Sequence, residues 1–381
     1  MPHETRRKSL LVSFADVPDP RTRACRYPWD ELMFTALCGV CSGADDWVGV
    51  VDWATLKLDW LRRHLAFENG VASHDTFSRV FSLLDAKCFE TCFVGWTKSL
   101  CPNLAQELIP IDGKSVRRSY NGETRMAHLV SAWHTTQGMV LGQVKTAAKS
   151  NEITAIPELL DALDIQGAII SIDAMGCQRA VVEKIVARQA DYIIGVKDNQ
   201  PLLAQAIEKL FDANDAKASA MPLEQDMSVD KGHGRVESRV CTVANDLQSL
   251  GGHNQAWAGL RSVIRVHSSR EVVNGKDKGE RSVEWRYYIS SLALSADDFN
   301  TAIRAHWSIE NSCHWVLDMT FREDECRIRT GHGAQNFAIL RRIALNLIKQ
   351  ERSGKSSVNI KRQRAGWSTA YLEKLLGRVA H

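Results

Sequence analysis

The apolar positions of the first hundred residues recur three and four residues apart, which is the spacing of one helix face. This pattern predicts helices over 29–41, 47–65 and 77–84. The segment Ser73-His-Asp-Thr before the third helix resembles a helix N-cap, because its hydroxyl and carboxylate oxygens can accept from the first free amides. We therefore expect an all-helical N-terminal domain over residues 1–100.

The next part, over residues 101–213, alternates between strand and helix patterns. The predicted strands are 107–112, 127–135, 139–146, 168–172 and 191–196, and the predicted helices are 153–163, 178–188 and 201–211. Three antiparallel strands, a helix, a strand, a helix and a strand give an α/β fold with a mixed five-stranded sheet. This order matches the ribonuclease H-like fold, in which the first and fourth strands lie side by side.

The pattern changes again after this part. Alternating polar and apolar residues at 233–243, 260–266 and 282–289 predict a β-rich insertion over residues 214–295, with a loop at 274–279. Residues 296–381 are predicted to be helical and to complete the interrupted core.

Composition excludes some classes of protein. The chain has 381 residues, of which 44% are hydrophobic and 24% charged, as is ordinary for soluble proteins. No apolar stretch approaches the roughly 20 residues of a membrane span, and the first residues lack an apolar signal core. We expect a cytoplasmic protein with no membrane partner.

Ten cysteines raise the question of zinc or disulfides. Cys38 and Cys41 form a C-x-x-C on an apolar helical stretch, but no second pair follows at zinc-finger distance. We interpret most cysteines as small buried apolar residues.

Basic residues are concentrated near the C-terminus. From Arg341 onward there are ten Lys or Arg against only Glu351 and Glu373. The ten are Arg341, Arg342, Lys349, Arg352, Lys355, Lys361, Arg362, Arg364, Lys374 and Arg378. This surplus suits either a phosphate backbone or a solvated helix face.

Three acidic residues stand out by their position. Asp112 follows the apolar run 108–111, Asp173 follows the run 168–172, and Glu310 lies in an aromatic and His-rich segment predicted to be helical. Adjacent strands would bring Asp112 and Asp173 together. Carboxylates gathered from two strand ends and a helix are suitable ligands for divalent metal ions. The alternative for either Asp alone is a turn or cap residue.

Several long motifs occur in one order. They include Ile111-Asp-Gly-Lys-Ser-Val-Arg-Arg-Ser, Lys149-Ser-Asn-Glu-Ile-Thr-Ala-Ile-Pro-Glu-Leu-Leu, Ile172-Asp-Ala-Met-Gly-Cys-Gln, Asp191-Tyr-Ile-Ile-Gly-Val-Lys-Asp-Asn-Gln, His233-Gly-Arg-Val-Glu-Ser-Arg and His306-Trp-Ser-Ile-Glu-Asn-Ser-Cys-His-Trp. Over almost the whole chain, these motifs resemble the H-repeat-associated branch of bacterial insertion-sequence transposases.

The resemblance implies a DDE transposase, with Asp112, Asp173 and Glu310 as catalytic residues that hold two Mg²⁺ ions, or Mn²⁺ as a substitute. Two such ions ~3.5–4 Å apart activate the attacking oxygen and stabilise the leaving one. Water would free a 3′-hydroxyl at the element's end, and this hydroxyl would attack target DNA. The expected partners are the terminal inverted repeats and target DNA, with a homodimer on DNA. We expect the protein to be associated with the nucleoid when it is bound to DNA.

Other polar residues are candidates for DNA contact. They are Lys114, Lys197, Asn199, Gln200, Arg235, Arg304, Lys361, Arg362 and Arg364. Either lysine of the core, Lys114 or Lys197, is otherwise a solvated charge at a strand end. Arg235 and Arg239 share a strand face with Glu237, which also suits a cross-strand ion pair.

The surroundings of Glu310 depart from the wider class. Many relatives carry Tyr, two residues, Arg, three residues, Glu, six residues and Lys, but here those positions outside the Glu are Ile303, His306 and Leu317. Arg304 and His314 are candidate substitutes for the missing basic groups.

The same segment allows a different kind of site. His306, Glu310, His314 and Asp318 recur every four residues and would line one face of an uninterrupted helix, as zinc ligands or as a structural polar face. Two functional alternatives also remain open, a decayed or domesticated DNA-binding protein and a metal-dependent nuclease that cannot join strands.

Overall fold

The computed structural model describes residues 14, 16–23, 25–120, 126–146, 152–216, 221–232, 234–274 and 277–377. The chain forms two compact units. We call Met1–Asn103, Gly113–Asp164 and Ile309–His381 the helical unit, and Leu104–Asp112 and Ile165–Ser308 the sheet unit. These units cut across the four sequence segments, because the first strand, β1 (Leu108–Val116), passes from one unit into the other.

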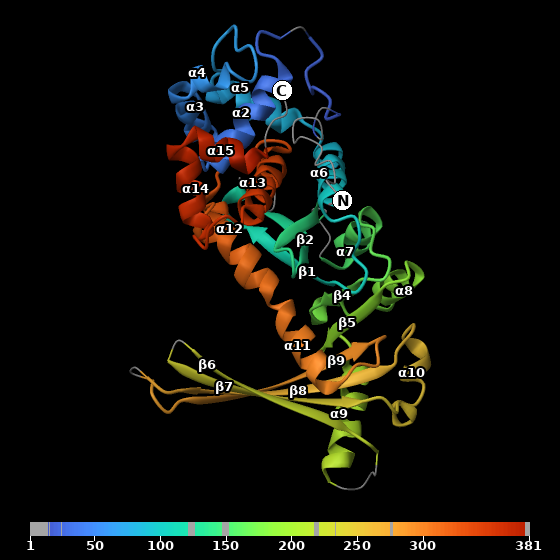
Figure 1. The fold of residues 1–381 in the computed structure, drawn as a ribbon. Helices are drawn as coiled ribbons and strands as arrows, with labels where there is room; N and C mark the ends of the chain where they lie inside the picture. The colour runs from blue at the N-terminus through green and yellow to red at the C-terminus, as the bar shows by residue number, and fades with distance from the viewer. Residues whose placement is uncertain are drawn as a thin grey trace, which may run out of the picture. The chain divides into compact units, whose positions relative to one another are not determined.

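The helical unit is built mainly from helices of both chain ends (Figure 1). They are α2 (Trp29–Cys41), α3 (Trp47–Leu56), α4 (Leu58–Leu61), α5 (His74–Leu83), α6 (Ala86–Leu100), α12 (Trp315–Met319), α13 (Gly333–Gln350), α14 (Val358–Trp367) and α15 (Thr369–Leu376). The helices predicted over 29–41 and 77–84 agree with α2 and α5 within a few residues, whereas the helix predicted over 47–65 is interrupted at Lys57. α6 was not predicted as a separate helix. Ser73 caps α5 as expected, since its side chain accepts from the Thr76 amide.

α13 is buried around almost its whole circumference, and it packs against α2, α5 and α6. Aromatic rings provide much of this core, with Trp47 within 4.7 Å of both Phe81 and Phe337, centroid to centroid. The antiparallel pair β2 (Ala127–His134) and β3 (Met139–Lys145) joins the same unit together with α7 (Glu152–Ala162). Asn346 of α13 fixes β3 by hydrogen bonds to both backbone groups of Val140.

The sheet unit contains a mixed sheet in the order β1-β4-β5-β9-β8-β7-β6. β1, β4 (Ile169–Ile172) and β5 (Asp191–Val196) are parallel. The other strands are antiparallel, namely β9 (Arg281–Ser290), β8 (Ser262–Val272), β7 (Arg235–Ala244) and β6 (Glu224–Gly232). The helices of this unit are α8 (Arg179–Ala187), α9 (Pro201–Asp215), α10 (His253–Ala256) and α11 (Ala296–His306).

The insertion strands β6–β9 carry a helix on each face (Figure 1). On one face, Phe299 of α11 is buried with Cys241, Val243 and Ile264. Residues alternate between faces along a strand, and on the other face Phe211 of α9 stacks on Tyr287 at 6.5 Å between centroids. The insertion thus extends the central sheet through the β5–β9 pairing.

Some details differ from the prediction. β1 continues to Val116 rather than ending at Asp112, and the insertion has an additional strand, β6. Residues 320–332 contain only a short 3-10 helix, Glu323–Glu325, within the segment predicted to be helical. The motif residues His233 and 149–151, and the basic Arg378, lie outside the described residues. None of the described helices is both long and apolar enough to span a membrane.

The cysteine prediction is confirmed for most positions. All ten cysteines are free thiols, and Cys38, Cys41, Cys177, Cys241, Cys313 and Cys326 are buried. Burial raises the pKa of the Cys41 thiol to about 12, which keeps it protonated and unreactive.

Candidate active site

Asp112 and Asp173 follow matched positions of two paired parallel strands. Ile111 of β1 lies opposite Ile172 of β4 in the parallel register. Each Asp is the next residue, so the two carboxylates leave neighbouring strands at the same level of the sheet, as the sequence predicts. The Asp173 carboxylate also accepts from the Met175 amide at 3.0 Å, which fixes the turn that follows the strand.

Two residues predicted to contact DNA support this turn. Asn199 Nδ2 donates to the carbonyl of Ala174 at 2.7 Å, and Gln200 Nε2 donates to the carbonyl of Cys177 at 2.9 Å. Both amides come from the segment after β5, next to the strand that carries Asp173. Their observed role is therefore to fix the loop after Asp173.

A pocket of about 100 Å³ opens beside Asp173 within the sheet unit. Its lining includes the basic residues Lys197 and Arg286 and the aromatic rings of His306 and Trp307. The Arg286 guanidinium lies 4.6 Å from the centre of the Trp307 ring and pairs with Glu284 at 2.8 Å. Cationic and aromatic groups together are suited to the phosphates and bases of nucleic acid.

His306 connects this pocket to the two aspartates. Its Nδ1 lies 2.9 Å from Ser171 Oγ, two residues before Asp173 on β4. Burial lowers the pKa of His306, although the charge of Asp112 acts in the opposite direction. His306 is therefore a half-buried neighbour of β4 rather than an exposed basic group.

Glu310 lies in the helical unit, exposed, at the first position of a π-helical turn, Glu310–His314, that leads into α12. A π-turn makes i→i+5 hydrogen bonds and often marks a functional position. It also interrupts the regular four-residue repeat. The premise of a zinc face formed by His306, Glu310, His314 and Asp318 on an uninterrupted helix is therefore wrong.

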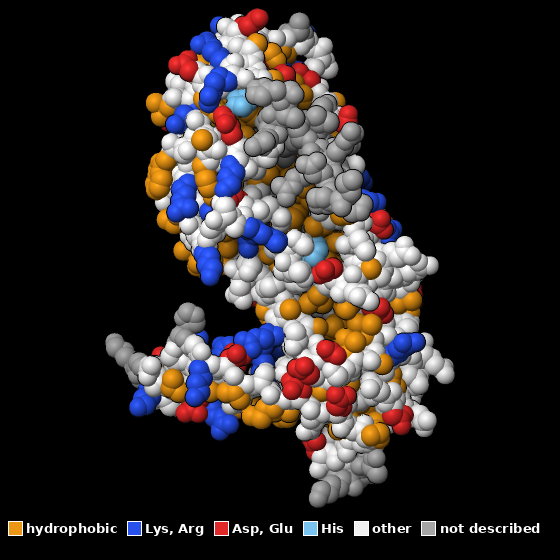
Figure 2. Space-filling view, in the orientation of Figure 1, with side chains coloured by type: hydrophobic (Ala, Val, Ile, Leu, Met, Phe, Trp, Pro, Cys, Tyr) orange, Lys and Arg blue, Asp and Glu red, His pale blue; other side chains and the backbone are white. Residues whose placement is uncertain are grey.

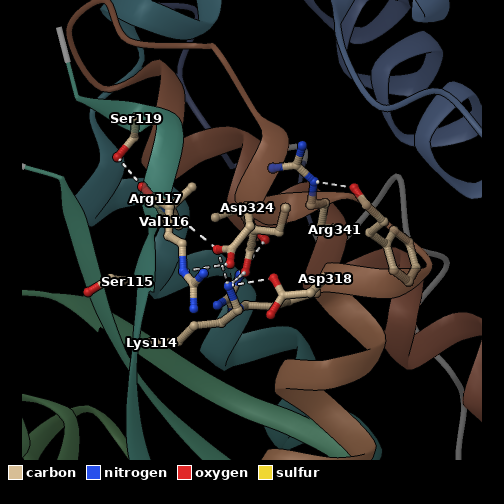
Figure 3. Close-up of polar contacts among 12 residues, drawn as sticks. Lys114, Ser115, Val116, Arg117, Ser119, Asp318, Asp324 and Arg341 are labelled. Carbon is tan, nitrogen blue, oxygen red and sulfur yellow. Dashed lines mark hydrogen bonds and ion pairs between the residues drawn. The ribbon is translucent and has the colours of Figure 1, made fainter.

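Lys114 was a candidate for DNA contact, but it is buried in the helical unit with 8% of its surface exposed. Its ammonium lies 2.7 Å from Asp318 Oδ1, 2.8 Å from Asp324 Oδ1 and 3.7 Å from Glu323 Oε2 (Figure 3). These contacts hold the lysine inside the protein, so the structure corrects the prediction. We call Lys114, Asp318, Glu323 and Asp324 the Lys114 cluster.

The Lys114 cluster is strongly ionic. Burial opposes the charge of Glu323, but Arg342 and Lys114 lower the pKa of its carboxyl to about 2. Arg342 of α13 is itself fully buried and donates to Glu323 Oε1 at 2.8 Å. Burial raises the pKa of Asp318, and Lys114 opposes this change. The cluster thus connects β1, α12 and α13.

The position between Asp112 and Lys114 is occupied by Gly113, which has polar side chains close to its Cα atom. A Cβ atom at this position would collide with the Glu152 carboxylate and lie 2.6 Å from His128 Nε2. His128 joins Glu152 at 2.6 Å and Ser115 Oγ at 2.8 Å. A side chain at position 113 would therefore displace Glu152 or His128 from this polar chain.

Only some side chains of the basic C-terminal segment are exposed to solvent. Lys361 is 7% exposed and lies 3.6 Å from Glu351, while Arg362 is 4% exposed and lies 2.9 Å from Asp45. Arg341 and Arg342 are also buried. These four cations bind groups of the protein, which corrects the assignment of Lys361 and Arg362 to DNA. Arg364 is exposed.

On the insertion, Lys and Arg side chains gather on the visible face of the strands (Figure 2). Arg235 is exposed, and Arg304 of α11 pairs with Asp230 of β6. Glu237 pairs with Arg239 at 2.6 Å and with Arg270 at 3.4 Å. Although burial raises its pKa, these arginines lower it overall. The sequence-based expectation of an ion pair at Glu237 is confirmed.

Sequence reasoning missed Arg286, His128 and Glu152. The sequence offered one signal for each of two residues. Arg286 lies among aromatic residues in a predicted strand, and Glu152 lies in the Asn-Glu-Ile-Thr motif. The partner groups are far away in sequence, so their pairing could not be read from local pattern.

Asp112 and Asp173 fit a divalent ion by the chemistry of their donor set, because hard cations prefer carboxylate oxygens. Among the described residues, no group of three or more His, Cys, Asp or Glu side chains is arranged to hold a metal ion. Asp112 and Asp173 are therefore a pair of candidate ligands for such an ion.

Comparison with known proteins gives consistent matches. The family described as "Transposase DDE domain" matches residues 76–347, and the family described as "DDE_Tnp_1-associated" matches residues 11–97. The chain belongs to the DDE transposase family, whose members generally use divalent metal ions.

Two relatives from Escherichia coli cover almost the whole chain. "Putative transposase YncI" of strain O157:H7 is 39% identical over 97% of this chain and 94% of that protein. "H repeat-associated putative transposase YhhI" of strain K12 is 37% identical over 97% of this chain and 98% of that protein. These matches confirm the H-repeat-associated branch. A chain of the piggyBac transposase synaptic complex with hairpin DNA aligns over 97% of this chain and 77% of that chain, with a TM-score of 0.43 and 10% identity.

Proposed function

We propose that this transposase cuts DNA at the ends of its mobile element and joins the freed 3′-hydroxyl to target DNA. Asp112, Asp173 and Glu310 would hold two Mg²⁺ ions, for which Mn²⁺ can substitute, in a ribonuclease H-like core. The observation that carries this proposal is the parallel register of Ile111 and Ile172, which presents Asp112 and Asp173 side by side. When bound, the ions would stabilise the charges of attacking and leaving oxygens.

The surrounding residues have separate tasks. Asn199 and Gln200 hold the loop after Asp173 through the carbonyls of Ala174 and Cys177. Lys197 and Arg286, which line the pocket beside Asp173, would bind phosphates of the strand to be cut. The exposed Arg235, Arg304 and Arg364 are proposed contacts to double-stranded DNA. Inverted repeats and target DNA would be bound by a homodimer.

The first test uses Asp112→Asn and Asp173→Asn. Each change removes a ligand charge with little change in volume, so we expect cleavage to be lost while DNA affinity and melting temperature remain near those of the wild type. Asp212→Asn on α9 is a matched control, because Asp212 is exposed in the same unit. Substantial Mg²⁺-dependent cleavage by either site variant would overturn the proposal.

The substrate is DNA that carries the sequence flanking the coding region, and both cleavage and strand joining are measured. Cleavage followed by joining supports the transposase. Cleavage without joining indicates a nuclease, and binding without cleavage indicates a decayed or domesticated DNA-binding protein.

The third ligand is tested by comparing Glu310→Gln with Glu237→Gln. Glu237 already pairs with two arginines, whereas Glu310 is exposed at the start of the π-turn. We expect Glu310→Gln to lower cleavage by several orders of magnitude and to weaken calorimetric Mn²⁺ binding without DNA. Glu237→Gln should leave Mn²⁺ binding unchanged, and the reverse result would move the assignment to Glu237.

A further inference from the structure

We propose that Lys114 is a positioning residue that fixes the helix of Glu310 on the strand of Asp112. This inference rests on the proposed function, because it assigns a purpose to the Lys114 cluster in the same reaction. It replaces DNA contact as the role of this lysine.

β1 carries both Asp112 and Lys114. Residues two apart on a strand point to the same face, so Lys114 lies on the face of β1 that presents Asp112, whereas Gly113 and Ser115 face His128 and Glu152. The Lys114 side chain is 7% exposed, so its ammonium depends on protein partners rather than water.

The Lys114 ammonium binds carboxylates from two different segments of the chain. Asp318 of α12, whose Oδ1 lies 2.7 Å from Lys114 Nζ, is eight residues after Glu310 on one continuous helical run. Asp324 lies beyond that run and accepts from Lys114 at 2.8 Å. The lysine therefore binds the helix of Glu310 near its end and the turn that follows (Figure 3).

A buried ion pair attaches the Lys114 cluster to α13. Glu323, 3.7 Å from Lys114, is held on its other side by the fully buried Arg342 of α13. The cluster is thus attached to the core helix of the helical unit. A buried ion cluster often contributes no more stability than apolar packing of similar volume, but its geometry defines the position of each partner. Displacement of a catalytic group by about 1 Å can cost 10²-fold in rate.

The decisive variant is Asp318→Asn. It removes one partner while Asp324 and Glu323 still neutralise Lys114, so the fold should persist. We expect DNA affinity to stay unchanged, cleavage to fall at least tenfold, and the Mg²⁺ concentration for half-maximal cleavage to rise. Mn²⁺ affinity measured by calorimetry without DNA should fall in parallel. Asp318→Glu retains the charge and should restore part of both quantities.

Arg117→Gln is the matched control. Arg117 also pairs with Asp324, at 3.1 Å, but its side chain is 79% exposed. We expect wild-type cleavage, Mg²⁺ dependence and Mn²⁺ affinity. A lower melting temperature of Asp318→Asn with unchanged Mn²⁺ affinity and Mg²⁺ dependence would show that the Lys114 cluster is only structural, and would overturn the inference.

Failure of the proposed function gives a different result. If the wild type binds Mn²⁺ but does not cut DNA, the proposed function fails, and positioning is judged from the Mn²⁺ affinity of Asp318→Asn alone. If the wild type cuts DNA and Asp318→Asn matches it in rate and metal affinity, only the positioning role of Lys114 fails.

Discussion

At the scale of single residues, Gly113 has little free space beside its Cα atom. An alanine Cβ would collide with the Glu152 carboxylate and press on His128. We predict that Gly113→Ala lowers the free energy of unfolding by about 1–3 kcal/mol, as overpacking typically does, in urea denaturation. Gly95→Ala on α6 is the control, because no atom lies within 4 Å of its added Cβ. It should stabilise the helix by roughly 0.5–1 kcal/mol, and equal effects at both positions would contradict this account.

Glu90 should make stability depend on pH near neutrality. Burial raises the pKa of its carboxyl to about 7, although Gln335 donates to it at 2.7 Å. The folded state therefore retains a proton that the unfolded state loses near its ordinary value of 4.5. The protonated Glu90 therefore contributes stability that is fully present below pH 4.5 and is lost as the pH rises through about 7, by up to about 3 kcal/mol.

The variant Glu90→Gln tests this pH dependence. It should lack the loss of unfolding free energy between about pH 5 and about pH 8 and be more stable than the wild type at the upper end. The exposed Glu183→Gln on α8 serves as control and should retain the wild-type slope. A wild-type slope in Glu90→Gln would assign the effect to another group.

The place of a residue in the fold was predictable where its neighbours in the sequence formed a clear pattern. Asp112 and Asp173 each follow an apolar strand, so their pairing could be anticipated from strand order. Lys114, Lys361 and Arg362 could not be assigned, because burial of a cation depends on distant carboxylates such as Asp318, Glu351 and Asp45. Local sequence shows the charge but not these partners.

At the scale of elements, α14 carries two neighbouring arginines with different roles. Arg362 donates to Asp45 and to backbone carbonyls of Val40 and Ala44, whereas Arg364 is exposed. We predict that Arg362→Met costs about 3–5 kcal/mol of unfolding free energy, since it leaves a partly buried carboxylate unpaired. Arg364→Gln should leave stability unchanged and reduce the log-log salt slope of DNA binding by about 0.9. A stability loss confined to Arg364→Gln would contradict this distinction.

The π-turn allows a similar test on the segment of Glu310. A π-turn contains one more residue per hydrogen-bonded ring than an α-turn, so deletion of Ser312 should convert it to regular α-helix. We expect the deletion variant to fold, but with Glu310 rotated relative to α12 and with weaker Mn²⁺ binding by calorimetry. Ser312→Ala keeps the turn and should bind Mn²⁺ normally. Wild-type Mn²⁺ affinity after the deletion would show that the turn has no role at Glu310.

Element prediction succeeded where periodicity was strong and failed where it was weak. The helices α2 and α5 and the strands β4 and β5 follow regular apolar patterns and were predicted within a few residues. β6 was missed, because Glu224–Gly232 is a mostly polar edge strand whose pairing with β7 is not visible in its own sequence. The π-turn was missed because a four-residue repeat suggests an uninterrupted helix.

At the scale of the whole molecule, the two units have separate cores but share one strand. The helical unit is centred on α13, and the sheet unit has its own apolar cluster around Phe299 and Ile264. β1 contributes Leu108–Asp112 to the sheet unit and Gly113–Val116 to the helical unit. If either unit unfolds, its part of β1 becomes disordered and the continuous strand is interrupted. We therefore expect the two units to unfold together.

Buried thiols provide the measurement. Cys177 and Cys241 belong to the sheet unit, and Cys38, Cys41, Cys313 and Cys326 belong to the helical unit. Burial raises the pKa of Cys177, Cys241 and Cys313 to about 12, which suppresses their reaction in the folded state. In pulse labelling with a thiol reagent, we predict that only the exposed Cys25 reacts rapidly without urea. All six buried thiols should become reactive at one urea midpoint. If Cys177 and Cys241 react at lower urea than the others, the shared strand does not couple the two units.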